Sequence, residues 1–229
     1  MQQTIKVIGF DADDTLWVNE PYFQEVEKQF CRILSPYLNE KETSAELFKT
    51  EMDNLEIYGF GAKGFILAMI ETALRITNGQ IKPNEISQII DTGKSLLTMP
   101  IELLDDVENV LKQLKGKYKL ILATKGDLLD QERKLQRSGL VNYFHHIEIM
   151  SDKHEDNYRK LLSHLDIEPR QFLMVGNSVK SDIIPVVNIG GKAIHIPFEV
   201  TWQHEKNHEA PESGSYLTVN SISQLLKLL

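Results

Sequence analysis

The sequence predicts an α/β protein with a three-layer, doubly wound, mostly parallel sheet and an α-helical domain inserted into it. Apolar, β-branched runs alternate with helical patterns along most of the chain, which is typical of parallel strands joined by crossover helices. About a hundred residues separate the first run from the second, where a crossover needs only about a dozen, so an extra domain is expected there. The predicted strands are 5–10, 119–123, 147–150, 172–175 and 192–196.

The insertion between the first two strands reads as helical throughout. Apolar residues repeat at intervals of three and four positions, which favours short amphipathic helices. Thr43 and Glu46 have the spacing of a capping box, in which each side chain accepts a hydrogen bond from the other residue's backbone N–H, and they predict the start of the second helix. The predicted helical stretches are 21–34, 43–55, 65–74 and 83–90.

These patterns predict the domain boundaries. The sheet-containing core takes 1–17 and 99–229, and the helical domain takes 18–98. Another amphipathic helix is expected over 101–114, with Gly116 just beyond its end, and it leads into the second strand. Asn19 and Glu20 lie where the chain enters the helical domain and are expected to form part of a hinge.

The composition is that of an acidic globular protein. The 229 residues include 33 acidic and 25 basic ones, the formal net charge is −8 and the isoelectric point is near 5.4. Nucleic acids and anionic membranes are not expected partners, because both need a basic face. No apolar run reaches the ~20 residues of a membrane span and no signal-type stretch follows the N-terminus, so a cytoplasmic location is expected. The single cysteine, Cys31, excludes an intrachain disulfide and is expected to be buried packing.

Polar segments follow four of the predicted strands at the point where each strand ends. Parallel strands bring those ends to one edge of the sheet, where α/β proteins bind ligands. Asp11 and Asp13 lie two residues apart in the first segment, and two buried like charges need a cation or a proton to neutralise them. A metal ion is therefore expected. The four segments are 11–15 (DADDT), 124–126 (TKG), 151–153 (SDK) and 176–182 (GNSVKSD).

With these four motifs in this order, the sequence resembles the haloacid dehalogenase (HAD) superfamily. The helical insertion between the first two motifs looks like the type 1 cap domain of that family, and the resemblance covers essentially the whole chain. It implies a HAD-like Rossmannoid core and a Mg²⁺-dependent phosphatase. Such an enzyme hydrolyses a small phosphorylated metabolite, a phosphomonoester, through an aspartyl-phosphate intermediate.

The resemblance implies a role for each acidic residue. Asp11 looks like the nucleophile, and one of its oxygens also binds Mg²⁺, a hard cation that prefers oxygen ligands. Asp13 protonates the leaving alcohol and then deprotonates the attacking water, while its main-chain carbonyl is a further metal ligand. Asp182 completes the metal site.

The remaining motif residues serve the phosphate and the surroundings of the metal. Thr124 and Lys125 offer donors to the phosphoryl oxygens, and Lys153 offsets both the phosphate and the carboxylate charges. The family often carries two acids in the fourth motif, and Asn177 stands where the first of them would be. We expect Asn177, with Ser178, to lie next to the metal ligands and Mg²⁺ binding to be retained.

The motifs also distinguish this function from several alternatives. A carbon-attacking dehalogenase and a phosphonate-cleaving enzyme are disfavoured, because both branches lack an acid at the position of Asp13. A β-phosphoglucomutase-like phosphomutase and an inactive phospho-ligand-binding protein stay open. In the insertion, Lys63 is a candidate for binding a substrate anion, although a solvated lysine is the favoured interpretation. The segment 204–208 (HEKNH) matches a zinc-protease pattern but is interpreted as a chance match or a surface loop, because no helical apolar spacing flanks it. The oligomeric state is not predicted.

Overall fold

The computed structural model describes residues 5–205 and 215–229, and the chain divides into two compact units. The first unit contains Met1–Glu20, Ile101–Lys125 and Gln131–Leu229. The second contains Pro21–Pro100 together with the short segment Gly126–Asp130. Among the described residues, no helix is both long enough and apolar enough to cross a bilayer.

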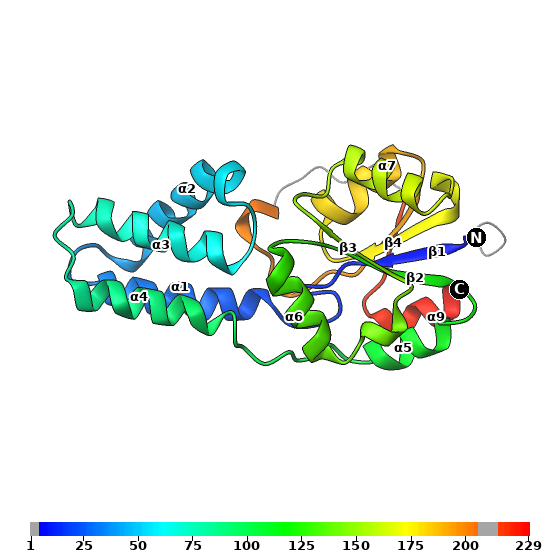
Figure 1. Cartoon of the computed structure of the whole chain (residues 1–229), viewed down its shortest axis with the longest axis horizontal. Helices are drawn as coiled ribbons and strands as arrows, with labels where there is room; N and C mark the ends of the chain where they lie inside the picture. The colour runs from blue at the N-terminus through cyan, green and yellow to red at the C-terminus, as the bar shows by residue number, and fades with distance from the viewer. Residues whose placement is uncertain (1–4, 206–214) are drawn as a thin grey trace. The chain divides into compact units, whose positions relative to one another are not determined.

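Within the described residues, a six-stranded, entirely parallel sheet forms the centre of the first unit (Figure 1), with the strand order β3-β2-β1-β4-β5-β6. This confirms the predicted α/β fold with its parallel sheet. The last strand has two residues and was not predicted, because so short a run carries no periodicity. The strands are β1 (Val7–Phe10), β2 (Lys119–Lys125), β3 (His146–Met150), β4 (Phe172–Gly176), β5 (Lys192–His195) and β6 (Leu217–Thr218).

Helices cover both faces of the sheet and so complete three layers (Figure 1). Side chains of a strand alternate between the two faces. In β1, Ile8 and Phe10 pack in the core that includes α5, whereas Val7 packs in the core that includes α7. One face carries α5 (Val107–Leu114), α6 (Leu128–Ser138) and α9 (Leu225–Leu228), and the other carries α7 (Glu155–His164) and α8 (Ile184–Asn188).

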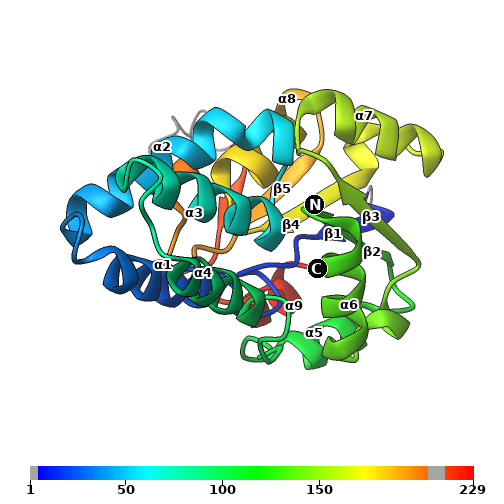
Figure 2. The same cartoon turned by 60° about the vertical axis from the view of Figure 1, so that its left-hand side comes forward.

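The second unit is built from α1 (Glu20–Leu34), α2 (Glu40–Tyr58), α3 (Ala62–Ile76) and α4 (Pro83–Ser95), which Figure 2 shows packed together. Each helix contributes to a shared apolar core, whose members include Phe30, Leu47, Met69 and Ile89. Cys31 belongs to the same core and is buried, which confirms the prediction made for it.

Three predicted helices begin at other residues than expected, and one of them is α3, which starts at Ala62 and not at residue 65. The second helix begins at Glu40, because the side chain of Asn39 caps it by accepting a hydrogen bond from Glu42 N. Thr43, which was predicted to cap this helix, is buried inside its first turns. The helix predicted over 101–114 begins only at Val107.

The residues before Val107 are used in main-chain pairing instead of a helix. Val18 N donates to Glu102 O at 2.9 Å, and Leu104 N donates to Leu16 O at 2.9 Å. Backbone groups committed to these bonds are not available to helical ones. The chain returning from the second unit therefore lies beside the loop that follows β1.

Candidate active site

The parallel register of β1, β2 and β4 sets the position of the motif residues. Phe10 at the end of β1 is in register with Leu122 of β2 and Val175 of β4. Asp11 follows immediately, with its backbone N–H donating to Val175 O at 2.9 Å. Thr124 lies two residues beyond Leu122 and is almost completely buried. The carboxyl ends of these strands thus bring the first, second and fourth motifs to one edge of the sheet.

Asp11 is a buried carboxylate with a donor on each oxygen. Its Oδ1 accepts a hydrogen bond from Lys153 Nζ at 2.5 Å, and its Oδ2 accepts one from Thr15 Oγ1 at 3.0 Å. Burial is the largest influence on its pKa and raises it, Lys153 lowers it, and the charges of Asp182 and Asp13 raise it further. The net result is a pKa of about 7, well above the ordinary 3.8.

Lys153 joins Asp11 to Asp182. Its Nζ also donates to Asp182 Oδ1 at 2.7 Å, and the side chains of Lys153 and Asp182 are each 1% exposed. Burial disfavours the ammonium, but the two carboxylates outweigh that effect and hold the pKa of Lys153 well above its usual range. Three predicted site residues from the first, third and fourth motifs are therefore in direct contact.

A π-helical segment, Val179–Ile183, presents Asp182 to this cluster. Such segments are rare and often occur at functional sites. Ser178 N donates to Asp182 Oδ2 at 3.1 Å, and the Ser178 hydroxyl accepts from Ser181 N, so Ser178 fixes the turn. A Cβ atom at Gly176 would overlap the Asp182 carboxylate, which explains why this strand ends in glycine.

The oxygens of Asp11 and Asp182 suit a hard divalent cation. Both are buried carboxylates that share a single ammonium, and Mg²⁺ is commonly held by one or two carboxylates together with water and phosphate oxygens. Across residues 5–205 and 215–229, no three His, Cys, Asp or Glu side chains are grouped closely enough to hold one ion. The donor set available here is thus two carboxylates, with main-chain carbonyl and water oxygens for the other positions.

Asn177 reaches Asp11 through Thr15. The backbone N–H of Asn177 donates to Thr15 Oγ1 at 3.1 Å, and that hydroxyl in turn donates to Asp11 Oδ2. On the other side, His195 Nε2 lies 3.0 Å from Asn177 O. His195 is the last residue of β5, so the end of this strand also contacts the fourth motif.

The side chain of Asp13 is held by a separate set of donors. Trp17 Nε1 donates to Oδ1 at 2.7 Å, Gln131 Nε2 donates to Oδ2 at 2.7 Å, and Lys134 Nζ lies 3.1 and 3.3 Å from the two oxygens. The loop turns sharply after Asp13, since Asp14 has a φ of 61°. Asp is one of the residues that tolerate this left-handed conformation.

The sequence prediction missed Gln131 and Lys134. Both lie on α6, three residues apart on its buried side. In the sequence, the only indication was that two polar residues share a helix face with Leu135. An amphipathic pattern does not show which buried polar residue meets a motif.

Lys125, predicted to bind phosphate, contacts Ser181 Oγ at 2.9 Å and forms an ion pair with Glu205. Burial would raise the pKa of Glu205, but Lys125 and the nearby serine hydroxyls lower it to about 2. Glu205 is therefore not a solvated loop residue, since its side chain is 10% exposed, and the match of this segment to the zinc-protease pattern agrees with the chance alternative. Residues 206–208 of that pattern lie outside the described residues.

Two features belong to the second unit. Lys63, at the start of α3, is half exposed and contacts both carboxylate oxygens of Asp127 at 2.9 Å, so it is paired and not simply solvated.

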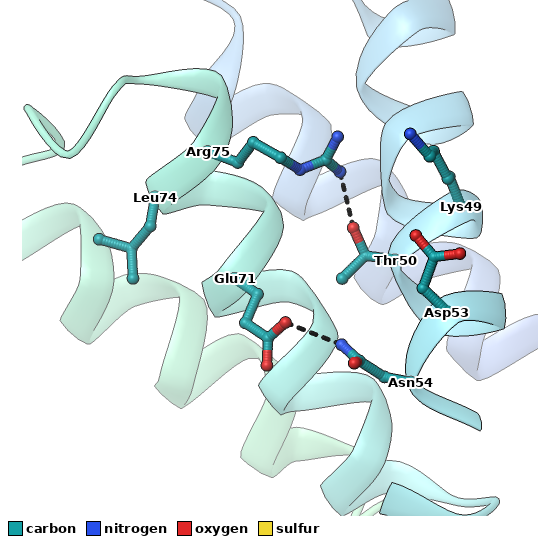
Figure 3. Close-up of a pocket in the computed structure, with 7 residues that line it drawn as sticks. All are labelled: Lys49, Thr50, Asp53, Asn54, Glu71, Leu74 and Arg75. Atoms are coloured by element: carbon teal, nitrogen blue, oxygen red, sulfur yellow. Dashed lines mark hydrogen bonds between the residues drawn. The ribbon is translucent and has the colours of Figure 1, made fainter. Parts of the chain in front are cut away.

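A groove of about 610 Å³, lined mainly by polar side chains, lies between α2 and α3 (Figure 3), where Arg75 Nη2 donates to Thr50 Oγ1. No predicted site residue lines this groove.

Comparison with known proteins identifies the family of the chain. Residues 5–190 match the model of the haloacid dehalogenase-like hydrolase family, so the chain belongs to that family. A haloacid dehalogenase-like hydrolase from Xanthomonas campestris has a similar structure, with a TM-score of 0.89 and 36% identity over 98% of this chain and 90% of that one.

Two curated relatives are phosphatases. The N-acylneuraminate-9-phosphatase of Mus musculus is 27% identical over 59% of this chain and 54% of its own length. The glyceraldehyde 3-phosphate phosphatase of Pyrococcus furiosus is 27% identical over 53% of this chain and 52% of its own length. The chain therefore spans about half the length of the curated relatives it matches.

Proposed function

We propose that the protein is a Mg²⁺-dependent phosphatase that hydrolyses a small phosphomonoester through an aspartyl-phosphate on Asp11. The observation that carries this proposal is the contact of one buried lysine, Lys153, with both Asp11 and Asp182. A nucleophilic carboxylate, an oxygen-rich cation site and a phosphate counter-charge are the parts that phosphoryl transfer needs. Asp13, two residues from the nucleophile, supplies the acid.

Each step uses a group of this chain. An oxygen of Asp11 forms a bond to phosphorus while the bond from phosphorus to the ester oxygen breaks, and Asp13 gives its proton to that oxygen. Water then attacks the phosphorus of the aspartyl-phosphate, and Asp13 takes its proton. The bond to Asp11 breaks, inorganic phosphate leaves, and both carboxyl groups are restored.

The surrounding residues lower the charge repulsion of these steps. Lys153 offsets the negative charge of the phosphoryl oxygens, and Thr124 offers a hydroxyl to them. Mg²⁺ held by Asp11, Asp182 and the main-chain carbonyl of Asp13 would neutralise the phosphate and orient it for in-line attack. Because Lys125 is paired with Glu205, its contribution to phosphate binding requires that pair to open or to be shared.

Asp13 favours phosphoryl transfer over attack on carbon. Release of a halide needs no proton, whereas an alkoxide leaving group needs one. The phosphatase names of two relatives support the same reaction class. We further propose that residues 18–98 act as a cap that selects the substrate, with Asn19 and Glu20 in its hinge.

A panel of phosphomonoesters tests the proposal. Inorganic phosphate release is measured with and without Mg²⁺ for the wild type, for Asp11→Asn, and for the control Asp105→Asn, which changes an exposed aspartate. The panel includes sugar phosphates, a nucleoside monophosphate and an aryl phosphate. Mg²⁺-dependent release by the wild type and the control, absent in Asp11→Asn, is the expected result. No turnover above the Asp11→Asn rate for any ester would contradict a hydrolase.

A further inference from the structure

Asp13 is fixed by side chains of α6 that no motif contains. Gln131 and Lys134 reach it from 118 and 121 positions further along the chain. With Trp17, they place a donor on each oxygen of the carboxylate, and 23% of the Asp13 side chain stays exposed. The carboxylate is thus held at one angle while an edge stays open to a reactant.

Lys134 is almost completely buried, which is rare for a lysine. Its side chain is 5% exposed, and its Nζ contacts both oxygens of Asp13 and, at 2.8 Å, Oδ1 of Asn19. Taking an ammonium out of water costs several kcal/mol unless partners compensate it. A leucine or methionine would fill this position on α6 at no such cost, so stability alone does not account for a lysine here.

The position of Gln131 also carries an energetic cost. Its Nε2 donates to Asp13 Oδ2 and to Lys125 O, whereas its Oε1 is buried with no hydrogen-bond partner within the part of the chain that the structure describes. A buried acceptor without a partner costs about 1–3 kcal/mol. Such costs are typical of sites where function fixes the side chain.

We propose that Lys134 and Gln131 are positioning residues for Asp13, which they hold at the angle and distance required for proton transfer with the leaving alcohol. This inference rests on the proposed function, in which Asp13 is the acid. Both residues act through the Asp13 carboxylate that they contact, and neither forms or breaks a bond in the reaction. Misplacing a catalytic group by about 1 Å costs about a hundredfold in rate, so the loss of one donor has a measurable effect.

The test compares two esters with different needs for an acid. An alkyl phosphate releases a poor leaving group that must be protonated, whereas p-nitrophenyl phosphate releases a stable anion. For each ester kcat/KM reports the steps up to phosphoryl transfer to the enzyme, and the ratio of the two values does not depend on how much of a preparation is folded. The ratio therefore separates a positioning role from a loss of stability.

The variants are Lys134→Met and Gln131→Met, with Arg133→Met as the matched control on the exposed side of the same helix. In Lys134→Met we expect kcat/KM for the alkyl ester to fall about 10- to 100-fold and the value for the aryl ester to fall much less. Gln131→Met is expected to change the ratio in the same direction, and Arg133→Met is expected to leave it unchanged. Lys134→Arg, which keeps the donor and the charge, is expected to restore part of the ratio.

The double variant Asp13→Asn/Lys134→Met completes the test. If Lys134 acts through Asp13, the second substitution adds no further loss to Asp13→Asn. Equal losses on both esters in Lys134→Met and Gln131→Met, or additive losses in the double variant, would overturn the positioning role. The alkyl ester is the one of the panel that the wild type turns over fastest. If the wild type hydrolyses no ester of the panel, the proposed phosphatase function fails instead, so the two failures are distinguishable.

Discussion

Burial of Asp11 makes the metal-free protein less stable at neutral pH, and removing its charge should show this. The side chain is 9% exposed, and its surroundings raise its pKa from 3.8 to about 7 in spite of Lys153. Between these two pH values the folded protein binds more protons than the unfolded chain, so stability falls as the pH rises. At about 1.4 kcal/mol per pH unit, the full loss is about 4 kcal/mol.

The substitution Asp11→Asn keeps the shape of the side chain and removes the charge. In EDTA we expect the variant and the wild type to be similar in stability near pH 4, where Asp11 is protonated in the folded protein. The variant should then gain steadily up to pH 7 and keep an advantage of about 4 kcal/mol above it. For a chain of this size that corresponds to about 8–16 °C in Tm.

Thermal unfolding in EDTA from pH 4 to pH 8 measures this difference. Asp105→Asn serves as the control, because its carboxylate is exposed and the variant should follow the wild type at every pH. Adding Mg²⁺ at pH 8 should raise the Tm of the wild type more than that of Asp11→Asn, since a cation that binds the folded state stabilises it. A variant no more stable than the wild type at pH 8 in EDTA, or a gain that does not grow between pH 4 and 7, would refute the reasoning.

Two further substitutions test the fourth motif and the pair beside it. Gly176→Ala introduces a Cβ that overlaps the Asp182 carboxylate. We therefore expect Mg²⁺ no longer to raise the Tm of this variant. An increase in Tm equal to that of the wild type would show that Asp182 can move aside without cost. Glu205→Gln should destabilise the protein by about 3 kcal/mol at pH 7. The reason is that the pKa of Glu205 is lowered to about 2, so its charge stabilises the fold above about pH 4.5 and this contribution is lost as the pH falls through 2. Urea unfolding at pH 7 measures it, and an unchanged midpoint would mean that the ion pair contributes nothing.

The parts of the site that could be predicted are those that strand ends determine. Lys153 contacts Asp11 across 142 positions of the sequence, yet each residue lies within three positions of the end of a predicted strand. Parallel pairing leaves few choices for where such residues meet. The roles inferred for them stay predictions, but their closeness follows from the alternation of strands and helices.

The parts that could not be predicted depend on side chains that point inward from helices and loops. Lys134 looks in the sequence like any basic residue of an amphipathic helix, and only the packing of α6 brings it to Asp13. Glu205 is similar, since it lies in a three-residue 3₁₀ turn that no periodicity indicates. Local patterns give the face of an element but not the partner that this face meets.

The neighbouring acids Asp11 and Asp13 were expected to need a cation, and in the structure they differ in how much positive charge lies beside them. Asp13 has Lys134 with two neutral donors, whereas Asp11 shares Lys153 with Asp182. Two carboxylates with one ammonium between them leave a net negative charge in a buried place, which is the arrangement that a divalent cation relieves. The unequal pairing therefore separates the two acids by function, with the metal site expected at Asp11 and Asp182 and the proton-transfer group at Asp13.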